Sequence, residues 1–292
     1  MVSGLQNNAL NPTESSDPVS LILVDTHVHF HAGHDPECLL DSASVNFGAT
    51  ARSLAEKASW EGVLVLTDDV GEPGFEAFLE YALLKPNDGS PGIGRWTFQN
   101  PDEDTTLHLR SDDDETLYLI AGRQIRTEDG LEILALGTRN QFSNHRSIST
   151  ILRDVREAGA LAVLPWGAGK WLGARRDNIR LVIDSCETCG LFLSDSGNRP
   201  VFWSKSSLFD LAADRGIRNL PGSDPLPLPG EHARVGTCGF ALPGELDLAR
   251  PSEDLKERLR NPTSDIQPFL RRERTLRFLR NQIAMQIKKR LR

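Results

Sequence analysis

The sequence predicts an α/β protein in which a mainly parallel sheet closes, or nearly closes, into a distorted β/α barrel. Strand-like apolar segments alternate with helical segments along most of the chain. Polar and charged side chains follow the ends of several of these strands, where such barrels build their sites. No repeat or linker interrupts the pattern, so we expect one domain over residues 21–250. Residues 1–20 are predicted to be a disordered leader, and residues 251–292 a helical extension packed on the barrel and ending in a basic amphipathic helix.

Hydrophobic periodicity and turn signals place the individual elements. The first strand is the apolar run that begins at Leu21 and ends in His27, His29 and His31. Further strands are predicted over 62–69, 96–98, 106–109, 116–126, 131–137, 161–165, 191–195 and 218–220, and helices over 50–60, 73–84, 147–158, 177–188 and 206–215. Pro73 suits an early helical position, where its missing N–H costs little. The turn at Glu128-Asp129-Gly130 indicates a hairpin between the strands on either side of it.

Composition excludes several classes of protein. The chain has 292 residues, of which 39% are hydrophobic and 25% charged, as in ordinary globular proteins. No apolar run is long enough to span a membrane, and none resembles a secretory signal. The cysteines are Cys38, Cys186, Cys189 and Cys238, too few and too scattered for a disulfide scaffold. Because these cysteines do not form a disulfide scaffold, we expect a reducing, cytoplasmic setting. The pair Cys186 and Cys189 lacks the second pair that a structural zinc site needs.

Charge is unevenly distributed along the chain. The formal net charge is −8, which argues against a general nucleic-acid binder. Residues 271–292 nevertheless contain nine Arg or Lys and one acidic residue, Glu273. Leu276, Leu279, Ile283 and Ile287 have helical spacing in this segment. We expect a helix docked on an acidic body; the alternative is an arm that contacts nucleic acid, a membrane or another partner. A membrane partner is not expected, and the basic helix leaves nucleic acid open.

The histidines after the first strand indicate a metal site. Side chains alternate faces along a strand, so His27 and His29 can point the same way and hold one cation, although they could also be ordinary polar strand positions. With Asp224 they form a three-ligand set for zinc, manganese or iron that leaves a position for water. Such an ion lowers the pKa of bound water towards neutrality. Asp69 or Asp195, each following a strand, could accept the proton of this water.

A group of cationic and amide side chains follows the same strand ends. Arg123, Arg126 and Arg199 are candidate substrate-binding residues together with Gln124, and Lys170 is a candidate catalytic residue. Guanidinium groups bind phosphate or carboxylate with two hydrogen bonds, so we expect a small anionic substrate such as a phosphoester. Gly167-Ala168-Gly169-Lys170 lacks the full pattern of a nucleotide-triphosphate loop.

Five motifs together resemble, in order and spacing, the PHP (polymerase and histidinol phosphatase) family. They are Asp25-Thr26-His27-Val28-His29, Leu66-Thr67-Asp68-Asp69, the segment 122–137, the segment 157–165, and Gly222-Ser223-Asp224. The resemblance implies a distorted seven-stranded β/α barrel, up to three divalent metals and phosphoester hydrolysis. The motif Asp-x-His-x-His is shared with the amidohydrolase superfamily.

The match to that family is partial. His27, His29 and Asp224 stand at ligand positions of the family, whereas Asp69 replaces a usual histidine and Gln124 a usual bridging glutamate. Glu132, Trp166 and Leu226 also stand where histidines are usual. A neutral amide cannot bridge two cations as a carboxylate can, so the resemblance implies fewer than three ions.

Three functions are therefore open. The first is a metal-dependent hydrolase, a phosphoesterase acting on a small anionic substrate. The second is a catalytically degenerate barrel that binds a ligand or a partner. The third is an amidohydrolase-type enzyme that cleaves a C–N or lactone bond, although Asp195 and Pro165 lie where further histidines would be expected.

Overall fold

The computed structural model describes residues 19–84, 91–99, 101–185 and 190–290. Its strands are β1 (Ser20–Val28), β2 (Ser59–Asp68), β3 (Gly92–Ile93), β4 (Trp96–Gln99), β5 (Thr106–Ser111), β6 (Thr116–Arg126), β7 (Glu132–Leu136), β8 (Leu161–Pro165), β9 (Leu191–Ser194), β10 (Cys238–Pro243) and β11 (Gln267–Leu270). Its helices are α1 (Pro36–Leu54), α2 (Gly74–Leu83), α3 (Ile148–Glu157), α4 (Ala174–Ser185), α5 (Leu208–Asp214), the 3-10 helix η1 (Glu231–Arg234), α6 (Pro251–Arg260) and α7 (Thr275–Arg290). Most of the expected leader (1–18), as well as Cys186 and Cys189, lies outside the described residues.

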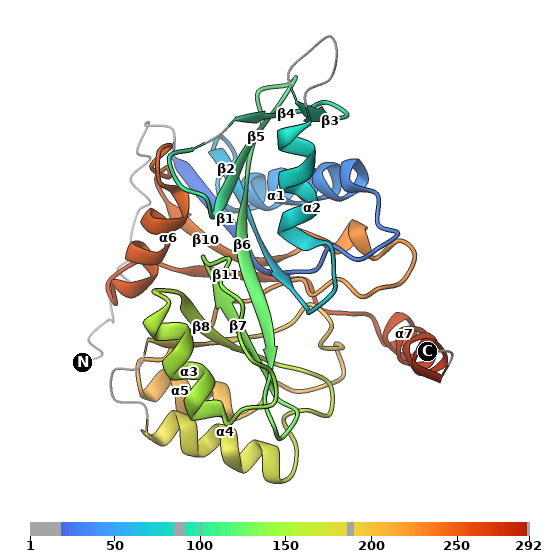
Figure 1. Cartoon of the computed structure of the whole chain (residues 1–292), viewed down its shortest axis with the longest axis vertical. Coiled ribbons are helices and arrows are strands. Elements are labelled where there is room, and N and C mark those ends of the chain that lie inside the picture. Colours follow the sequence, from blue (N-terminus) through green and yellow to red (C-terminus); the bar gives the residue numbers. More distant parts are fainter. Residues whose placement is uncertain (1–18, 85–90, 100, 186–189, 291–292) are drawn as a thin grey trace, which may run out of the picture.

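All described strands belong to one large, branched sheet (Figure 1). Its main path runs β11-β10-β1-β2-β6-β5-β4-β3, and β7, β8 and β9 extend from β6 as a second branch. The long strand β6 makes this branch possible, because it pairs with β5 along its first half and with β7 along its second. Only β1–β2, β2–β6 and β8–β9 are parallel among the pairs of named strands. The expectation of a mainly parallel sheet is therefore wrong; the hairpin between β6 and β7 reverses the chain direction.

The sheet does not close into a barrel, so of the two expected forms, closed or nearly closed, the closed one is not seen. The segment 218–224 lies between β9 and the end of β1, where a closing strand would have to pair with both. Its residue Asn219 forms only an isolated bridge to Leu193, instead of the predicted strand over 218–220. On the other side, Thr26 donates a side-chain hydrogen bond to the carbonyl of Leu220 at 2.9 Å. Pro221 has no N–H to continue a ladder, so a few hydrogen bonds span the gap instead of a strand.

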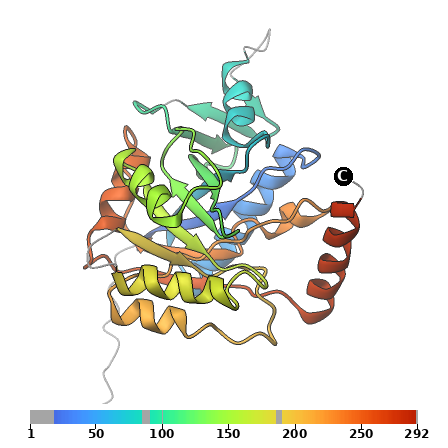
Figure 2. The same cartoon turned by 60° about the horizontal axis from the view of Figure 1, so that its bottom comes forward.

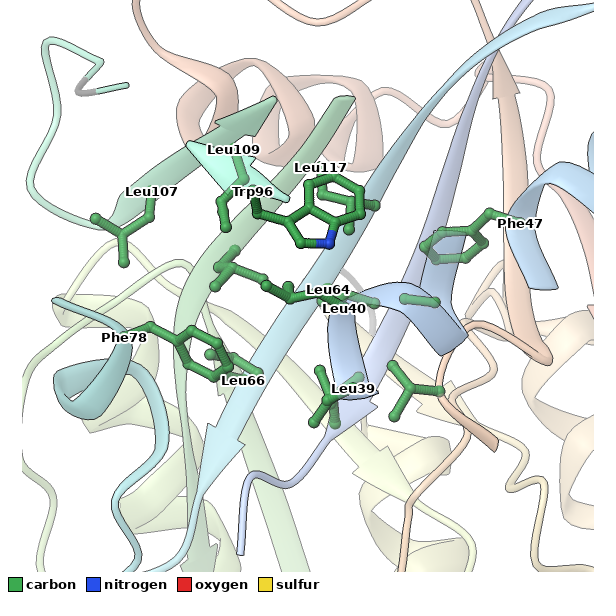
Figure 3. Close-up of a cluster of buried hydrophobic side chains, with 14 of the residues drawn as sticks. Leu39, Leu40, Phe47, Leu64, Leu66, Phe78, Trp96, Leu107, Leu109 and Leu117 are labelled. Atoms are coloured by element: carbon green, nitrogen blue, oxygen red, sulfur yellow. The ribbon is translucent and has the colours of Figure 1, made fainter. Parts of the chain in front are cut away.

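Helices α1 and α2 cover the outer face of the first branch of the sheet. Figure 3 shows Leu39 and Phe47 of α1 and Phe78 of α2 packed among leucines of the neighbouring strands. A second apolar cluster lies between the β7–β9 branch and helices α3, α4 and α5. A third cluster, on the inner face, joins both branches and includes Ile22 and Val24 of β1. These clusters hold the two branches in one body. No helix of the described chain has the length and apolar content needed to cross a bilayer.

The helix predicted over 50–60 is wrong in position. Helix α1 begins fourteen residues earlier than expected, at Pro36, and Trp60 lies in β2, paired with Leu21. Its start has a clear physical cause, because the side chain of Asp35 accepts the backbone N–H of Cys38 at 2.8 Å and Pro36 occupies the first turn. This Asp-Pro start signal is present in the sequence.

Helix α7 stands at the edge of the body in both views of the fold (Figures 1 and 2). It docks through Phe278 and Asn281, which are buried. The predicted helix exists, but the docked face is not the one that its aliphatic spacing suggested. Leu276, Leu279, Ile283 and Ile287 all remain exposed.

Candidate metal centre

A register shift in β1 sets the direction of the histidines. Leu21 and Leu23 face the outer cluster and Ile22 and Val24 the inner one. Between Asp25 and Val28 the pairing with β2 shifts, after which Val28 lies on the outer side. One residue out of register exchanges the two faces of a strand. The shift therefore turns the odd-numbered side chains His27 and His29 towards the inner side.

His27, His29 and Asp224 converge, as the sequence predicts. Each contributes one ligand atom, and these atoms lie within 4.8 Å of one another. The two Nε2 atoms are 2.9 Å apart, and they lie 3.7 Å (His27) and 3.8 Å (His29) from Oδ1 of Asp224. Two imidazole nitrogens and one carboxylate oxygen form a donor set that suits zinc, manganese or iron.

Asp25 fixes the relative positions of these ligands. It is fully buried, and its carboxylate accepts backbone N–H groups of Ser223 at 2.9 Å and Gly236 at 2.9 Å, with a longer contact to His27 N at 3.3 Å. Ser223 precedes the ligand Asp224, whose own N–H donates to the carbonyl of His27 at 2.8 Å. Burial raises the pKa of Asp25 to about 6, although the hydrogen bonds from Ser223, Gly236 and His27 oppose this shift.

Electrostatics favours the protonation states that a metal requires. Burial, followed by the neighbouring His27, lowers the pKa of His29 well below its ordinary 6.5, so the ring is neutral. Burial also opposes the charge of Asp224, but His27, a hydrogen bond from Asn198 and the charge of Lys170 hold the pKa of this carboxyl below its usual range. A neutral His29 and an ionised Asp224 are the forms that bind a cation. The donor set therefore fits a single divalent metal.

A cavity of about 340 Å³ opens over these ligands. His29, Asp224 and Gln124 line it, and the Oε1 atom of Gln124 lies 3.3 Å from His27 Nε2. The structure also brings Asp69, Arg126 and Lys170 to its wall. Arg126 pairs with Asp69, and Lys170 pairs with Glu132.

Three predicted site residues are not brought to this cavity. Arg123 alternates with Gln124 on β6 and is buried in a pair with Asp68 at 3.1 Å. Asp195 and Arg199 form a buried pair with two hydrogen bonds, at 2.8 and 2.7 Å. Each of these groups is occupied by a structural partner.

Sequence reasoning missed several residues that line the cavity. Glu72 lies 3.3 Å from Nδ1 of His31 at its rim. One wall comes from α7, through Phe278, Asn281, Gln282 and Met285. The pattern Phe278, Asn281, Met285 has helical spacing, which is the signal that could have identified this second face.

The buried Asp68 gives a testable pH dependence. Burial raises its pKa to about 7, while hydrogen bonding from the Phe75 N–H and the charge of Arg123 oppose this. Because the folded protein then binds this proton more tightly than the unfolded chain, the contribution of Asp68 to stability is greatest below about pH 4 and declines as the pH rises to about 7. Between about pH 5 and pH 8, wild type should lose about 2–3 kcal/mol more of its free energy of unfolding than Asp68→Asn. Urea unfolding of both proteins at the two pH values measures this difference, and parallel profiles would contradict the raised pKa.

Comparisons with known proteins bear on the fold. No family model and no curated protein matches this chain. Among solved structures, PsfC from Pseudomonas syringae aligns with a TM-score of 0.54 at 13% identity, over 93% of this chain and 98% of PsfC. The lesion-specific endonuclease PfuEndoQ from Pyrococcus furiosus aligns with a TM-score of 0.49 at 12% identity, over 85% of this chain and 57% of the endonuclease. Endonuclease Q bound to a 27-mer duplex with an abasic lesion aligns with a TM-score of 0.48 at 11% identity, over 85% of this chain and 58% of the endonuclease.

These likenesses differ in weight. At 13% identity, the match to PsfC concerns the fold alone. The two endonuclease matches have TM-scores below 0.5 and carry no argument about this chain. The chain is therefore a mixed α/β protein with a large open sheet, and its fold is similar to that of PsfC.

Proposed function

We propose that this protein is a metal-dependent phosphoesterase of the PHP type that hydrolyses a small anionic phosphoester. The observation that carries the proposal is the convergence of His27, His29 and Asp224 at a cavity whose wall presents Arg126 and Lys170. The motif resemblance described above supports the same reaction class.

The three ligands would hold one divalent ion. When bound, such an ion lowers the pKa of a water molecule and offsets negative charge on phosphoryl oxygens. With fewer carboxylates than a trinuclear centre requires, and with the neutral Gln124 beside His27, the site suits fewer than three ions.

The remaining side chains have distinct roles in this proposal. Arg126 and Lys170 bind the phosphate, exchanging part of their present pairing with Asp69 and Glu132 for the substrate. Asp69 accepts a proton from the attacking water, since Asp195 is held by Arg199 away from the cavity. The amide of Gln124, which lies beside His27, donates to or accepts from a neutral oxygen or nitrogen of the substrate and so orients it.

Charge around the cavity predicts an order of binding. Carboxylates outnumber Lys and Arg among its lining residues. The cavity alone therefore repels an anion, and a divalent cation reverses this tendency. A phosphate ester is expected to bind only after the metal.

Elemental analysis of protein purified without chelator or nickel affinity resin tests the proposal. Wild type should contain about one equivalent of zinc, manganese or iron, and His27→Gln/His29→Gln should contain little, because two of three ligands are lost. Loaded wild type should hydrolyse a generic phosphomonoester at least about a hundredfold faster than the double variant. His145→Asn is the matched control, since His145 is exposed, has a positive φ that asparagine tolerates, and lies outside the cavity.

The same experiment separates the alternatives. Metal binding with cleavage of an amide or lactone, and not of a phosphoester, would favour the amidohydrolase-type function. No metal in wild type, even after incubation with zinc, manganese and iron, would overturn the hydrolase proposal and favour a ligand-binding protein.

A further inference from the structure

Helix α7 presents an aliphatic face to solvent that the fold leaves uncovered. The exposed fractions are 82% for Leu276, 49% for Leu279, 63% for Ile283 and 54% for Ile287. Their spacing places them in one line along the helix, which we call the outer stripe. Within the described residues, no other helix exposes more than one large aliphatic side chain. A contiguous exposed row of this kind marks an interaction surface.

The opposite face of α7 is fixed to the body, so the outer stripe cannot rotate inwards. Glu231 of η1 is fully buried and accepts hydrogen bonds from Arg277 at 2.9 Å and Asn281 at 3.1 Å. Phe278 packs against Phe202, with ring centroids 5.8 Å apart. Near the end of the helix, Lys288 donates to the carbonyl of Pro227 at 2.7 Å. The helix is therefore held by polar and aromatic contacts along its inner side.

Charge along α7 is entirely positive. The segment 275–290 contains Arg277, Arg280, Lys288, Lys289 and Arg290 and no acidic residue, in a chain of net charge −8. Arg280 and Arg290 are exposed beside the outer stripe. An aliphatic row flanked by Arg and Lys is the composition of helices that lie in the interface of anionic membranes.

Other occupants fit this surface less well. A second copy of α7 would bring two all-basic helices together, and like charges beside an apolar seam oppose pairing. A nucleic acid would neutralise the basic residues but would leave the aliphatic row against phosphates and sugars, with no apolar partner.

We propose that the outer stripe of α7 docks this protein on the surface of an anionic lipid membrane. The aliphatic side chains enter the headgroup boundary, and Arg280 and Arg290 contact anionic headgroups. The position of α7 at the edge of the body leaves its outer side accessible to a flat surface (Figure 2). Docking is peripheral and requires no spanning segment. It is independent of the proposed hydrolase activity.

Co-sedimentation of the full chain with vesicles tests this proposal. Wild type should partition at least about tenfold more strongly onto phosphatidylcholine vesicles with about 30% phosphatidylserine than onto phosphatidylcholine alone. Leu279→Gln/Ile283→Gln should lower partitioning onto the anionic vesicles by about tenfold or more. Arg280→Gln/Arg290→Gln should weaken it less and flatten its salt dependence.

The matched control is Val45→Gln/Leu181→Gln, which alters exposed aliphatic residues on α1 and α4 and should bind vesicles as wild type does. Equal thermal unfolding of all variants is expected, because every changed side chain is exposed. Failure of wild type to sediment with anionic vesicles would overturn the proposal. Two other results would also overturn it, provided that Leu279→Gln/Ile283→Gln leaves vesicle binding unchanged. The first is a wild-type dimer in sedimentation velocity that this variant does not form. The second is wild-type binding to duplex DNA that this variant loses.

Discussion

Asp25→Ala is expected to lower the free energy of unfolding by about 3 kcal/mol or more, because it strands buried backbone donors. The carboxylate accepts hydrogen bonds from the backbone N–H groups of Ser223, Gly236 and His27, which lie in three separate parts of the chain. Because the site is fully buried, water cannot replace the carboxylate as their acceptor. Since Ser223 precedes Asp224, the variant should also lose most of its affinity for metal. Chemical denaturation followed by circular dichroism, together with a chelator competition titration, measures both effects.

Two companion variants sharpen this result. Asp25→Asn keeps one acceptor oxygen but turns an amide N–H towards a backbone donor, so it should fall between wild type and Asp25→Ala. Asp35→Ala removes an exposed aspartate that caps α1 by accepting the N–H of Cys38, and should cost much less than Asp25→Ala. If Asp25→Ala costs no more than Asp35→Ala and still binds metal, Asp25 does not organise the centre.

Gly239→Ala should lower the free energy of unfolding by a similar amount, for a steric reason. A Cβ atom at Gly239 would lie 2.0 Å from the carbonyl oxygen of Val24, across the β10–β1 pair. The two strands must then separate where β1 approaches the candidate metal centre, and we expect a loss of about 3 kcal/mol in the free energy of unfolding. Differential scanning calorimetry and urea titration of the variant measure this loss.

The control is another buried glycine with room for a methyl group. At Gly48 in α1 the nearest heavy atom to an added Cβ is Arg52 Nη1, at 3.4 Å. Gly48→Ala should therefore be neutral or stabilise by about 0.5–1 kcal/mol, because alanine favours helix. Equal stabilities of the two alanine variants would show that β10 can shift without cost.

Much of the fold could be predicted because local periodicity reports local structure. The strand β6 and the helices α3 and α5 lie where their patterns place them, within a few residues. The closed barrel could not be excluded from sequence, since closure depends on whether the segment 218–224 pairs with both neighbours. The start of α1 at Asp35-Pro36 could have been found, because capping and proline signals are both local.

The site shows the same division. His27, His29 and Asp224 were identifiable because strand ends converge, whereas the register shift that turns the histidines inwards has no sequence signal. Arg123 and Gln124 are adjacent on one strand, so alternation alone shows that both cannot face the cavity. Helix α7 has two candidate faces, and the buried Glu231 that selects between them is far away in the sequence.

The anchoring of α7 has a kinetic consequence for ligand exchange. Swinging the helix outwards would break the Arg277 ion pair with Glu231, the Asn281 hydrogen bond and the packing of Phe278 together. If those contacts cost about 3–5 kcal/mol to lose, the open form is populated by about one molecule in a hundred to one in several thousand. A molecule that binds in the cavity must therefore enter through a mouth with a fixed wall. The size of such a molecule sets its rate of exchange, because α7 does not move outwards to admit it.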